Sequence, residues 1–360
     1  MEAETRYHPN ADQLALAGTI EESLAPLLPL SRLHASHVED VQTWSSLDDI
    51  GIFGISVAEE QGGSGLGAAE EALIVMALGQ RLVAPAVLAT IGAAHAVFGA
   101  GPGSTGGGGA AVLRGRRVAA AYRRGARTVI VDDAAADLVL VRDRGNAALY
   151  ELAFCTLQPV DDRLWLAGLR EVVGSDELAR LADARAQAAR SGDAREVAGS
   201  GTAGGLGEPI ARFEAPQLLR LRLIDAAALA GISQAALDMS VAYAGTRTQF
   251  GRPIGSFQAV KHHCANMVSA ARRARDQTCF AAVALDEGRD DAALQVECAL
   301  FVAGSAALEN AGKNIQIHGG MGFSDEADPH LLLKRAQLLS TIAGGLEAAN
   351  ERIADIKAGW

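Results

Sequence analysis

The chain has few aromatic residues, few cysteines and no excess of basic residues. Phe, Trp and Tyr make up 4% of its 360 residues, whereas 49% of the residues are hydrophobic. The core therefore has to be built mostly from Ala, Leu and Val, which favours closely packed helices over aromatic-rich sheets. A chain of this length is long for one domain, and we expect about two or three.

The shortage of positive charge limits the classes of partner. The formal net charge is -11 at pH 7. This balance argues against nucleic acids and anionic membrane surfaces, and an anionic ligand would need a local basic site. The most apolar window, residues 82–100, is of marginal length for a membrane span and contains Pro85 and His95. We therefore expect a buried helix there, in a soluble protein with no membrane partner.

Cysteine usage indicates a reducing compartment. No CxxC spacing and no paired framework is present among the four cysteines, Cys155, Cys264, Cys279 and Cys298. Such a pattern is typical of reduced thiols in a cytosolic protein. The N-terminal stretch MEAETRYHPNADQ is polar and acidic, so we predict no signal peptide and a cytoplasmic location. Adjacent helix positions point apart, so the run from His262 to Cys264 does not suit a metal ion, and no metal site is expected.

Periodicity and composition divide the chain into three predicted domains. Residues 1–100 form an N-terminal helical domain, with helix starts expected at Thr19 and at the N-cap-like Ser46 and a further helix from Ala68. The glycine-rich stretch 101–109 is a linker. It contains the letters GxGxxG, but no strand precedes it and no helix follows, so we do not interpret it as a dinucleotide site.

The middle of the chain changes to short β-rich runs. They predict a small antiparallel sheet or barrel within residues 110–213. The runs are 127–131, 137–141, 147–152 and 163–166, and the stretch 176–194 has a helical pattern.

Four Ala- and Leu-rich segments complete the chain in residues 215–360. Their apolar spacing predicts helices over 217–244, 257–286, 292–314 and 329–358, the second with Ser256 as a plausible N-cap. An antiparallel four-helix bundle buries four such faces most simply.

The connector between the first two of these helices combines glycine, proline and hydrogen-bond donors. Gly251, Pro253 and Gly255 break the helical pattern, and Arg247 offers a fork of donors beside two glutamines and Phe250. Such a corner suits a phosphate-containing cofactor. An ordinary inter-helix turn with a surface arginine is the alternative on these grounds.

Two motifs give the chain a resemblance to a known family. Arg-x-x-Phe-Gly-x-x-Ile-x-x-x-Gln, beginning at Arg247, and Gln-Ile-x-Gly-Gly-x-Gly-Phe, beginning at Gln316, resemble signatures of the acyl-CoA dehydrogenases. The stretch 58–65 is similar to that family's Pro-Glu-Glu-x-Gly-Gly run, with Ala58 in place of proline. The resemblance implies a mostly α fold with an N-terminal helical domain, a shortened middle β domain and a C-terminal four-helix bundle.

The resemblance also implies a chemistry in which this chain lacks one part. In the family, FAD oxidises a CoA thioester while a glutamate removes the α-proton. The two positions known for that glutamate correspond to Ala343 and Leu221, and neither is a carboxylate. Asp225 and Glu347 lie four residues from these positions, but a solvated helix-surface acid is the usual case. We therefore predict no catalytic residue in this chain.

Contacts to the flavin divide into two halves in homomeric members of the family. The half that one subunit gives to its neighbour's flavin is present here and comprises Arg247, Gln249, Phe250, Gln258, Gln316, Gly319 and Gly320. The half that a subunit gives to its own flavin is missing: no Thr-Glu-Pro-x-Ala-Gly-Ser-Asp run occurs, and Gly345 replaces a threonine. His318 faces the cofactor or is packed, and Lys334 and Arg335 read as a solvated helix face.

This pattern favours one hypothesis over two others. The chain resembles the base-lacking subunit of heteromeric acyl-CoA dehydrogenases that act on steroid side-chain thioesters. That implies an α2β2 assembly with FAD shared across the interface, a partner subunit carrying the catalytic glutamate, an acyl-CoA substrate and an electron-transfer acceptor. The alternatives are a self-sufficient flavoenzyme that uses Asp225 or Glu347 as its base, and a non-enzymatic scaffold that has lost flavin.

Overall fold

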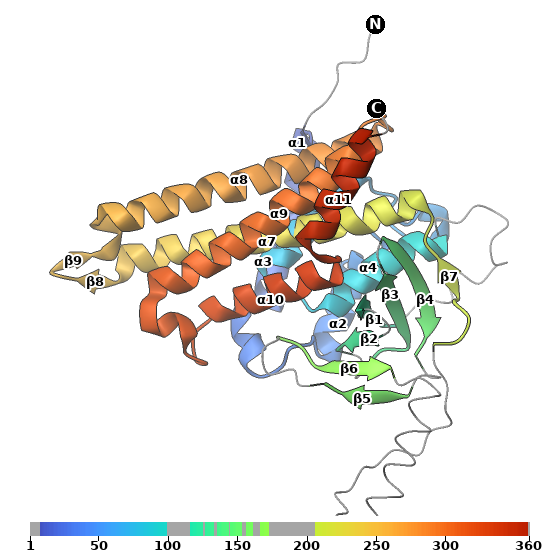
Figure 1. Ribbon diagram of the computed structural model, residues 1–360, viewed down its shortest axis with the longest axis horizontal. Helices are drawn as coiled ribbons and strands as arrows, with labels where there is room; N and C mark the ends of the chain where they lie inside the picture. Colours follow the sequence, from blue (N-terminus) through green and yellow to red (C-terminus); the bar gives the residue numbers. More distant parts are fainter. Residues whose placement is uncertain are drawn as a thin grey trace, which may run out of the picture.

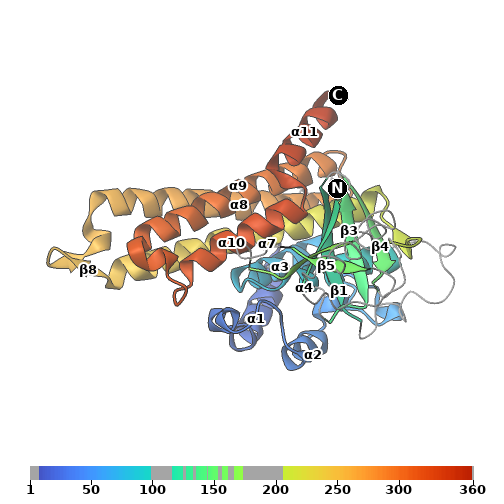
Figure 2. The ribbon, with the colours of Figure 1, turned by 60° about the horizontal axis from the view of Figure 1, so that its bottom comes forward.

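The structure is a computed structural model in which a seven-stranded sheet packs at one end of a helical bundle and a helical N-terminal region (Figure 1). It describes residues 8–98, 116–124, 127–132, 135–143, 145–152, 156–160, 166–172 and 206–358. Figure 2 shows α1 and α2 beneath the bundle and the sheet at one end of it. The predicted linker 101–109 and the predicted helix 176–194 lie outside the described residues.

The N-terminal region contains four α-helices and short 3-10 turns. The helices are α1 (Ala11–Leu27), α2 (Val41–Asp49), α3 (Ala68–Gln80) and α4 (Pro85–Phe98), and the turns are η1 (Leu30–His34), η2 (Ile52–Gly54) and η3 (Glu59–Gln61). Asn10 and Asp40 cap α1 and α2 by accepting the backbone N–H of the third helical residue. The predicted starts at Thr19 and Ser46 are therefore wrong, because each helix already begins at an earlier capping residue.

Helices α3 and α4 are buried on nearly all sides, as the apolar window predicted for α4. The carboxylate of Asp286 on α8 (Gln258–Asp286) accepts the N–H groups of Ala68 and Ala69 at 2.6 and 2.9 Å. These bonds satisfy two of the four donors that a helix leaves unpaired at its N-terminus. They also tie the N-terminal region to the bundle.

The sheet has seven strands in the order β5-β6-β2-β1-β3-β4-β7. The strands are β1 (Val118–Arg124), β2 (Arg127–Val131), β3 (Leu138–Asp143), β4 (Asn146–Glu151), β5 (Leu157–Pro159), β6 (Leu169–Val172) and β7 (Ala211–Arg212). β1 pairs with β3 in parallel, whereas the other pairs are antiparallel. The expectation of a purely antiparallel sheet is therefore wrong at its centre, because β2 folds back on one side of β1 and the chain returns to the other side.

Three long helices and two shorter ones form the C-terminal bundle within residues 215–358. They are α7 (Ala215–Thr246), α8, α9 (Ala292–His318), α10 (Pro329–Ile342) and α11 (Gly345–Ala358). The single helix predicted over 329–358 is broken, because Gly344 and Gly345 have φ values of +95° and +84° that a helix cannot contain. Ser256 lies in the turn η4 (Ile254–Ser256), and Phe257 occupies the N-cap of α8 without a side-chain bond, so that prediction is also wrong.

Small residues let the helices approach closely, as the alanine-rich composition indicated. A Cβ on Gly79 of α3 would lie 2.2 Å from the carbonyl oxygen of Ala228 on α7. A Cβ on Gly231 would lie 2.1 Å from the oxygen of Met76. By length and composition α9 is apolar enough to cross a membrane, but half of its apolar window is buried inside the protein.

Candidate functional site

The connector from Arg247 to Gln258 is an ordered hairpin at the far tip of the bundle, where Figure 1 labels β8 and β9. β8 (Thr248–Gln249) pairs with β9 (Arg252–Pro253), and Phe250 and Gly251 turn between them with φ values of +51° and +77°. Backbone bonds close its base: Arg247 N–H donates to the Tyr243 oxygen and Ile254 N–H to the Arg247 oxygen, both at 2.8 Å. The geometry of the hairpin is therefore fixed by its own backbone.

The side chains of this hairpin point to solvent. Arg247, Gln249 and Gln258 are exposed, and none of their side chains has a hydrogen bond or ion pair to another described residue. Phe250 is 92% exposed, with its ring edge-to-face with Phe257 at 6.1 Å. An aromatic ring in water loses the free energy that burial would give it, so a turn with no binding role has no reason to expose one. The exposed side chains of this hairpin therefore suit contact with a ligand or another chain.

The second predicted loop lies at the same end of the bundle, after α9 (Figure 1). The turn η5 (Gly319–Phe323) begins there, and Gln316 is exposed on the last turn of α9, with its Oε1 accepting from Lys313 Nζ at 2.9 Å. Gly319 has a φ of +62°, and a Cβ on Gly319 or Gly320 would meet nothing within 4 Å. Backbone is thus open to a ligand at both glycines, while Met321 is 53% exposed.

A stacked pair that the sequence did not predict joins the ends of α7 and α9, from which the two loops start. The His318 ring lies on the Tyr243 ring at 4.0 Å between centroids and 23° between planes. His318 Nδ1 is 2.8 Å from the Asn314 oxygen. Burial lowers the pKa of His318 below its ordinary value, so the ring is neutral near pH 7 and its Nδ1–H donates to that oxygen. Of the two roles expected for His318, the structure therefore shows the packed one.

The two base positions predicted from the resemblance lie together at the opposite end of α7. Leu221 and Ala343 both line a cavity of about 50 Å³ between the β3–β4 hairpin, α7 and the α10–α11 turn. Small-molecule sites are usually about 300–1,000 Å³, and one water takes about 30 Å³ in the liquid. The cavity therefore has no room for a flavin ring or a thioester.

Packed side chains fill the surrounding cleft. Leu221 is 3% exposed and packs on α4 at Gly92, where a Cβ would lie 2.5 Å from its Cδ1. Arg142 of β3 forms a two-point ion pair with Asp225, one bond being 2.8 Å from Nη1 to Oδ1. Their side chains are 12% and 5% exposed. Asp225 is therefore not on a solvated helix face, and its carboxylate is already engaged.

A second buried ion cluster closes the cleft beside Ala343. Glu297 Oε1 accepts from Arg222 Nη1 at 2.7 Å and from Arg352 Nε at 2.8 Å, and the Glu297 side chain is 1% exposed. Arg222 Nη2 also donates to the Gly145 oxygen of the β3–β4 turn at 3.1 Å. Glu347, the other candidate base, is exposed on the first turn of α11.

The interpretation of Arg335 as part of a solvated face is wrong. Its side chain is completely buried on α10, and its Nη2 donates to the His37 oxygen at 3.3 Å. Burial lowers the pKa of Arg335 to about 10, while Asp132 and Glu39 oppose this by attracting its charge. The adjacent Lys334, in contrast, is only half-buried.

Comparison with known proteins identifies the family. The model of the acyl-CoA dehydrogenase N-terminal domain matches residues 11–103, and that of the acyl-CoA dehydrogenase C-terminal domain matches residues 215–357. The chain belongs to the acyl-CoA dehydrogenase family. The resemblance and the fold class expected from the two motifs are thereby confirmed. The boundaries predicted for the three domains stay predictions.

Curated members of the acyl-CoA dehydrogenase family match this chain over short stretches. The acyl-CoA dehydrogenase FadE34 of Mycobacterium tuberculosis is 45% identical over 124 residues, which are 33% of this chain and 17% of that protein. The acyl-CoA dehydrogenase IpdE2 of the same organism is 39% identical over 106 residues, 29% of this chain and 31% of the relative. The matched stretch thus spans less than a third of either relative.

Solved structures match the fold over nearly the whole chain. The ChsE4–ChsE5 complex from Mycobacterium tuberculosis superposes with a TM-score of 0.73 at 22% identity, over 98% of this chain and 99% of that one. The steroid ACAD Tcur3481–Tcur3483 superposes with a TM-score of 0.74 at 20% identity, over 97% and 98%. At these identities the likeness establishes the fold alone.

Proposed function

We propose that this chain is the base-lacking subunit of a heteromeric, FAD-dependent acyl-CoA dehydrogenase. It contributes contacts to the phosphate and adenosine side of an FAD molecule. The partner subunit contacts the flavin ring and carries the catalytic glutamate. The observation that carries this proposal is the contrast along α7. The side-chain donors of Arg247 and Gln249 at its C-terminal end are exposed and have no partner among the described residues, whereas the cleft at its N-terminal end is closed around Leu221 and Ala343.

The residues at the exposed end fit part of an FAD molecule. Arg247 presents a planar guanidinium, which matches phosphate oxygens in a two-point contact. Gln249, Gln258 and Gln316 present amide groups. The bare backbone at Gly319 allows a nucleotide to approach closely. Bound FAD would supply the acceptor for the hydride that leaves the acyl chain, and these residues would hold and orient its phosphate side.

The residues at the closed end do not fit the ring side of a flavin or a thioester. Both base positions are apolar, and a cavity of about 50 Å³ admits neither group. Opening it would require breaking the Arg142–Asp225 pair and separating Glu297 from its two arginines. We therefore assign no proton transfer to this chain and place the base on the partner.

The partner that we propose is a second acyl-CoA dehydrogenase-like chain, in an α2β2 assembly. The similarity to structures of two-subunit acyl-CoA dehydrogenases supports this choice. The exposed rings of Phe250 and Phe323, at 92% and 73% exposure, supply the apolar surface that such an interface needs. The steroid character of one structural neighbour supports a bulky acyl group as the substrate. We propose in addition that the oxidation uses an electron-transfer acceptor and takes place in the cytoplasm.

The two rival functions find less support in the structure. A self-sufficient enzyme would need Asp225 or Glu347 as its base, but Asp225 is held by Arg142 and Glu347 is a solvated acid at the start of α11. A scaffold without flavin would have no use for the unpartnered donors around Arg247. Neither rival accounts for both ends of α7.

Co-expression with a glutamate-bearing acyl-CoA dehydrogenase subunit tests the proposal. We expect flavin absorbance and acyl-CoA oxidation in the co-complex only, with flavin lost from the complex on Arg247→Ala. Flavin binding with turnover by the chain alone would establish the self-sufficient enzyme. Absence of flavin from the chain and from every complex that forms would favour the scaffold.

A further inference from the structure

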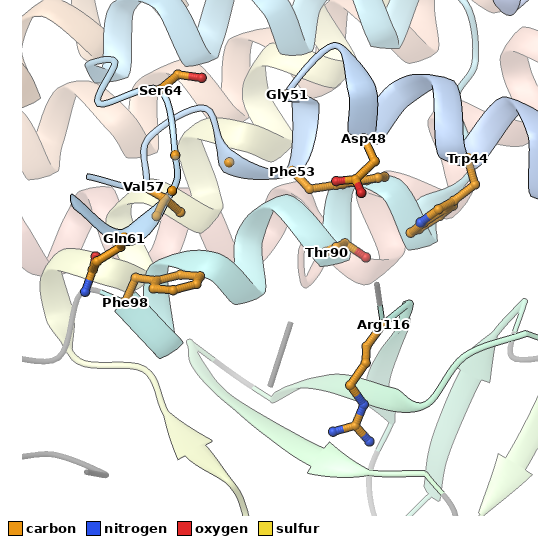
Figure 3. A pocket seen from close by; sticks show the side chains of 13 residues that line it. Trp44, Asp48, Gly51, Phe53, Val57, Gln61, Ser64, Thr90, Phe98 and Arg116 are labelled. Carbon is orange, nitrogen blue, oxygen red and sulfur yellow. The ribbon is translucent and has the colours of Figure 1, made fainter. Parts of the chain in front are cut away.

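The N-terminal helical region carries a cavity of about 340 Å³ that is separate from both ends of α7 (Figure 3). Its volume lies within the usual range of about 300–1,000 Å³ for small-molecule sites. None of its lining residues belongs to the Arg247 hairpin, to the loop after α9 or to the closed cleft. They are Trp44, Asp48, Gly51, Phe53, Gly54, Val57, Gln61, Gly62, Gly63, Ser64, Thr90, Phe98 and Arg116.

Contacts within the protein hold the walls of this cavity in place. Trp44 stacks on Phe53 with 4.6 Å between centroids, and the Arg117 guanidinium covers the Trp44 ring at 4.4 Å. The glycine-rich wall is fixed by backbone bonds, including those from Ser64 N–H to the Gly54 oxygen at 2.9 Å. A Cβ on Gly63 would lie 2.2 Å from the Val57 oxygen, so this wall has to be bare backbone. A preformed cavity loses little ordering entropy on binding.

Three polar side chains at the cavity are available to a ligand. Asp48, Gln61 and Ser64 are exposed and make no side-chain hydrogen bond or ion pair to other described residues. In contrast, Thr90 Oγ1 already donates to the Ala86 oxygen and accepts from Val118 N–H. Arg116 directs both Nη atoms at the Glu151 carboxylate, at 3.3 and 2.8 Å.

Among the described residues, the charged side chain at this cavity that has no counter-ion is an acid. The Asp48 carboxylate has no counter-ion among the described residues, whereas the Arg116 cation is neutralised by Glu151. In Figure 3, Asp48, Phe53 and Trp44 lie toward one end of the cavity, and Phe98 and Gln61 lie toward the other. The site thus combines an acceptor at one end with aromatic rings along its length.

From this arrangement we propose that the cavity binds a small cyclic molecule with a hydrogen-bond donor head, and that it prefers an ammonium group to a hydroxyl and rejects a carboxylate. The head donates to Asp48, and the ring lies against Phe53, Phe98 and the edge of Trp44. The site is independent of the flavin contacts proposed above.

Three probes that share one phenol ring test this assignment. Tyramine carries an ammonium head, tyrosol a hydroxyl and 4-hydroxyphenylacetate a carboxylate. We expect calorimetric affinity for the purified full chain to fall in that order, with tyramine binding about fivefold more weakly to Asp48→Asn because the counter-charge is gone. Asp49→Asn is the matched control, since Asp49 is an exposed neighbour that does not line the cavity.

Trp44 reports where the probes bind. Tyramine should change the intrinsic fluorescence of the chain, and Trp44→Phe should abolish that change while calorimetric affinity stays within about twofold, because Phe retains the stack on Phe53. The proposal is overturned if none of the three probes binds at millimolar concentration, or if the carboxylate binds as tightly as the ammonium. It also fails if Asp49→Asn weakens tyramine as much as Asp48→Asn does, or if the fluorescence change survives in Trp44→Phe.

Discussion

The two ends of α7 differ in almost every physical respect. Near its N-terminal end, Leu221, Arg222 and Asp225 are packed or ion-paired inside the protein. At its C-terminal end, Arg247 follows the last turn with its guanidinium in solvent. At 1.5 Å per residue, Arg222 and Arg247 lie roughly 37 Å apart. One helix thus packs into a closed core at one end and leads into exposed donors at the other. Under the proposed function, the two halves of a flavin site can therefore be lost or kept separately.

The largest expected effect is on stability and concerns the buried ion pair near the N-terminal end of α7. Asp225→Ala removes one partner of a buried pair and leaves the Arg142 charge uncompensated, which should lower the free energy of unfolding by about 3–5 kcal/mol. Chemical denaturation measures this value. The double variant Arg142→Leu/Asp225→Leu should recover most of the loss, and Asp238→Ala, an exposed acid on the same helix, should stay within about 0.5 kcal/mol. If Asp225→Ala were as stable as its control, the cleft would not be held closed by this pair.

The next largest effect is on FAD binding and concerns Arg247 at the C-terminal end of α7. Arg247→Ala should weaken FAD binding to the co-complex by about tenfold to a hundredfold, since hydrogen bonds to a charged group contribute about 1.5–3 kcal/mol. The melting temperature of the isolated chain should not change, because the side chain has no described partner. Arg273→Ala, an exposed arginine on α8, is the control. Equal flavin affinity in the two variants would remove Arg247 from the site.

A smaller effect concerns the stacked pair that joins the loops. His318→Ala removes the ring on Tyr243 and should weaken FAD binding in the co-complex about fivefold, since an aromatic pair contributes about 0.5–1.5 kcal/mol. His318→Phe keeps a ring in the same place and should bind FAD within about twofold of the parent chain. Should His318→Phe lose as much affinity as His318→Ala, the stack would not be what positions the loops.

The same histidine makes stability depend on pH. The pKa of His318 is lowered in the folded chain, so below its ordinary value of about 6.5 the unfolded chain binds more protons than the folded one. The free energy of unfolding should therefore fall on acidification from about pH 7 to pH 5 by more in the parent chain than in His318→Phe. Denaturation at both pH values measures the difference. Identical pH profiles would show that His318 titrates equally in both states.

The smallest expected change follows restoration of a carboxylate at a base position. Ala343→Glu should leave acyl-CoA oxidation by the isolated chain at background, because the cavity of about 50 Å³ admits no substrate. A steady-state assay with added FAD checks this. Turnover above background would mean that the missing base, and not the closed cleft, is what prevents catalysis.

Much of the structure at the C-terminal end of α7 was predictable from the sequence, because it depends on residues that are close together in the chain. The glycines, the proline and the donors between Arg247 and Gln258 are consecutive, and the hairpin depends on short-range backbone bonds. Helix positions in the bundle followed from apolar spacing for the same reason. The predicted start of α1 was wrong because Asn10, which has no distinctive motif around it, caps the helix instead of Thr19.

The packing near the N-terminal end of α7 was not predictable, because its contacts join residues that are far apart in the sequence. Asp225 was expected to be either solvated or a replacement base, and the structure shows it buried in an ion pair with Arg142, which lies 83 residues away in the sequence. Arg335 was placed on a solvated face, although α10 turns it completely inward. Nothing in a local pattern distinguishes an acid that faces water from one that meets an arginine on a distant strand.

The sequence by itself determined that no carboxylate stands at position 221 or 343 and that the residues of the Arg247 and Gln316 motifs are present. These are statements about residue identity, and a motif is sufficient to make them. Only the tertiary structure decided that the cleft beside Leu221 is filled while the surface beside Arg247 is open. Burial and ion pairing depend on which surfaces pack together, and here residues of β3, α4, α7, α9 and α11 meet only once the whole chain has folded.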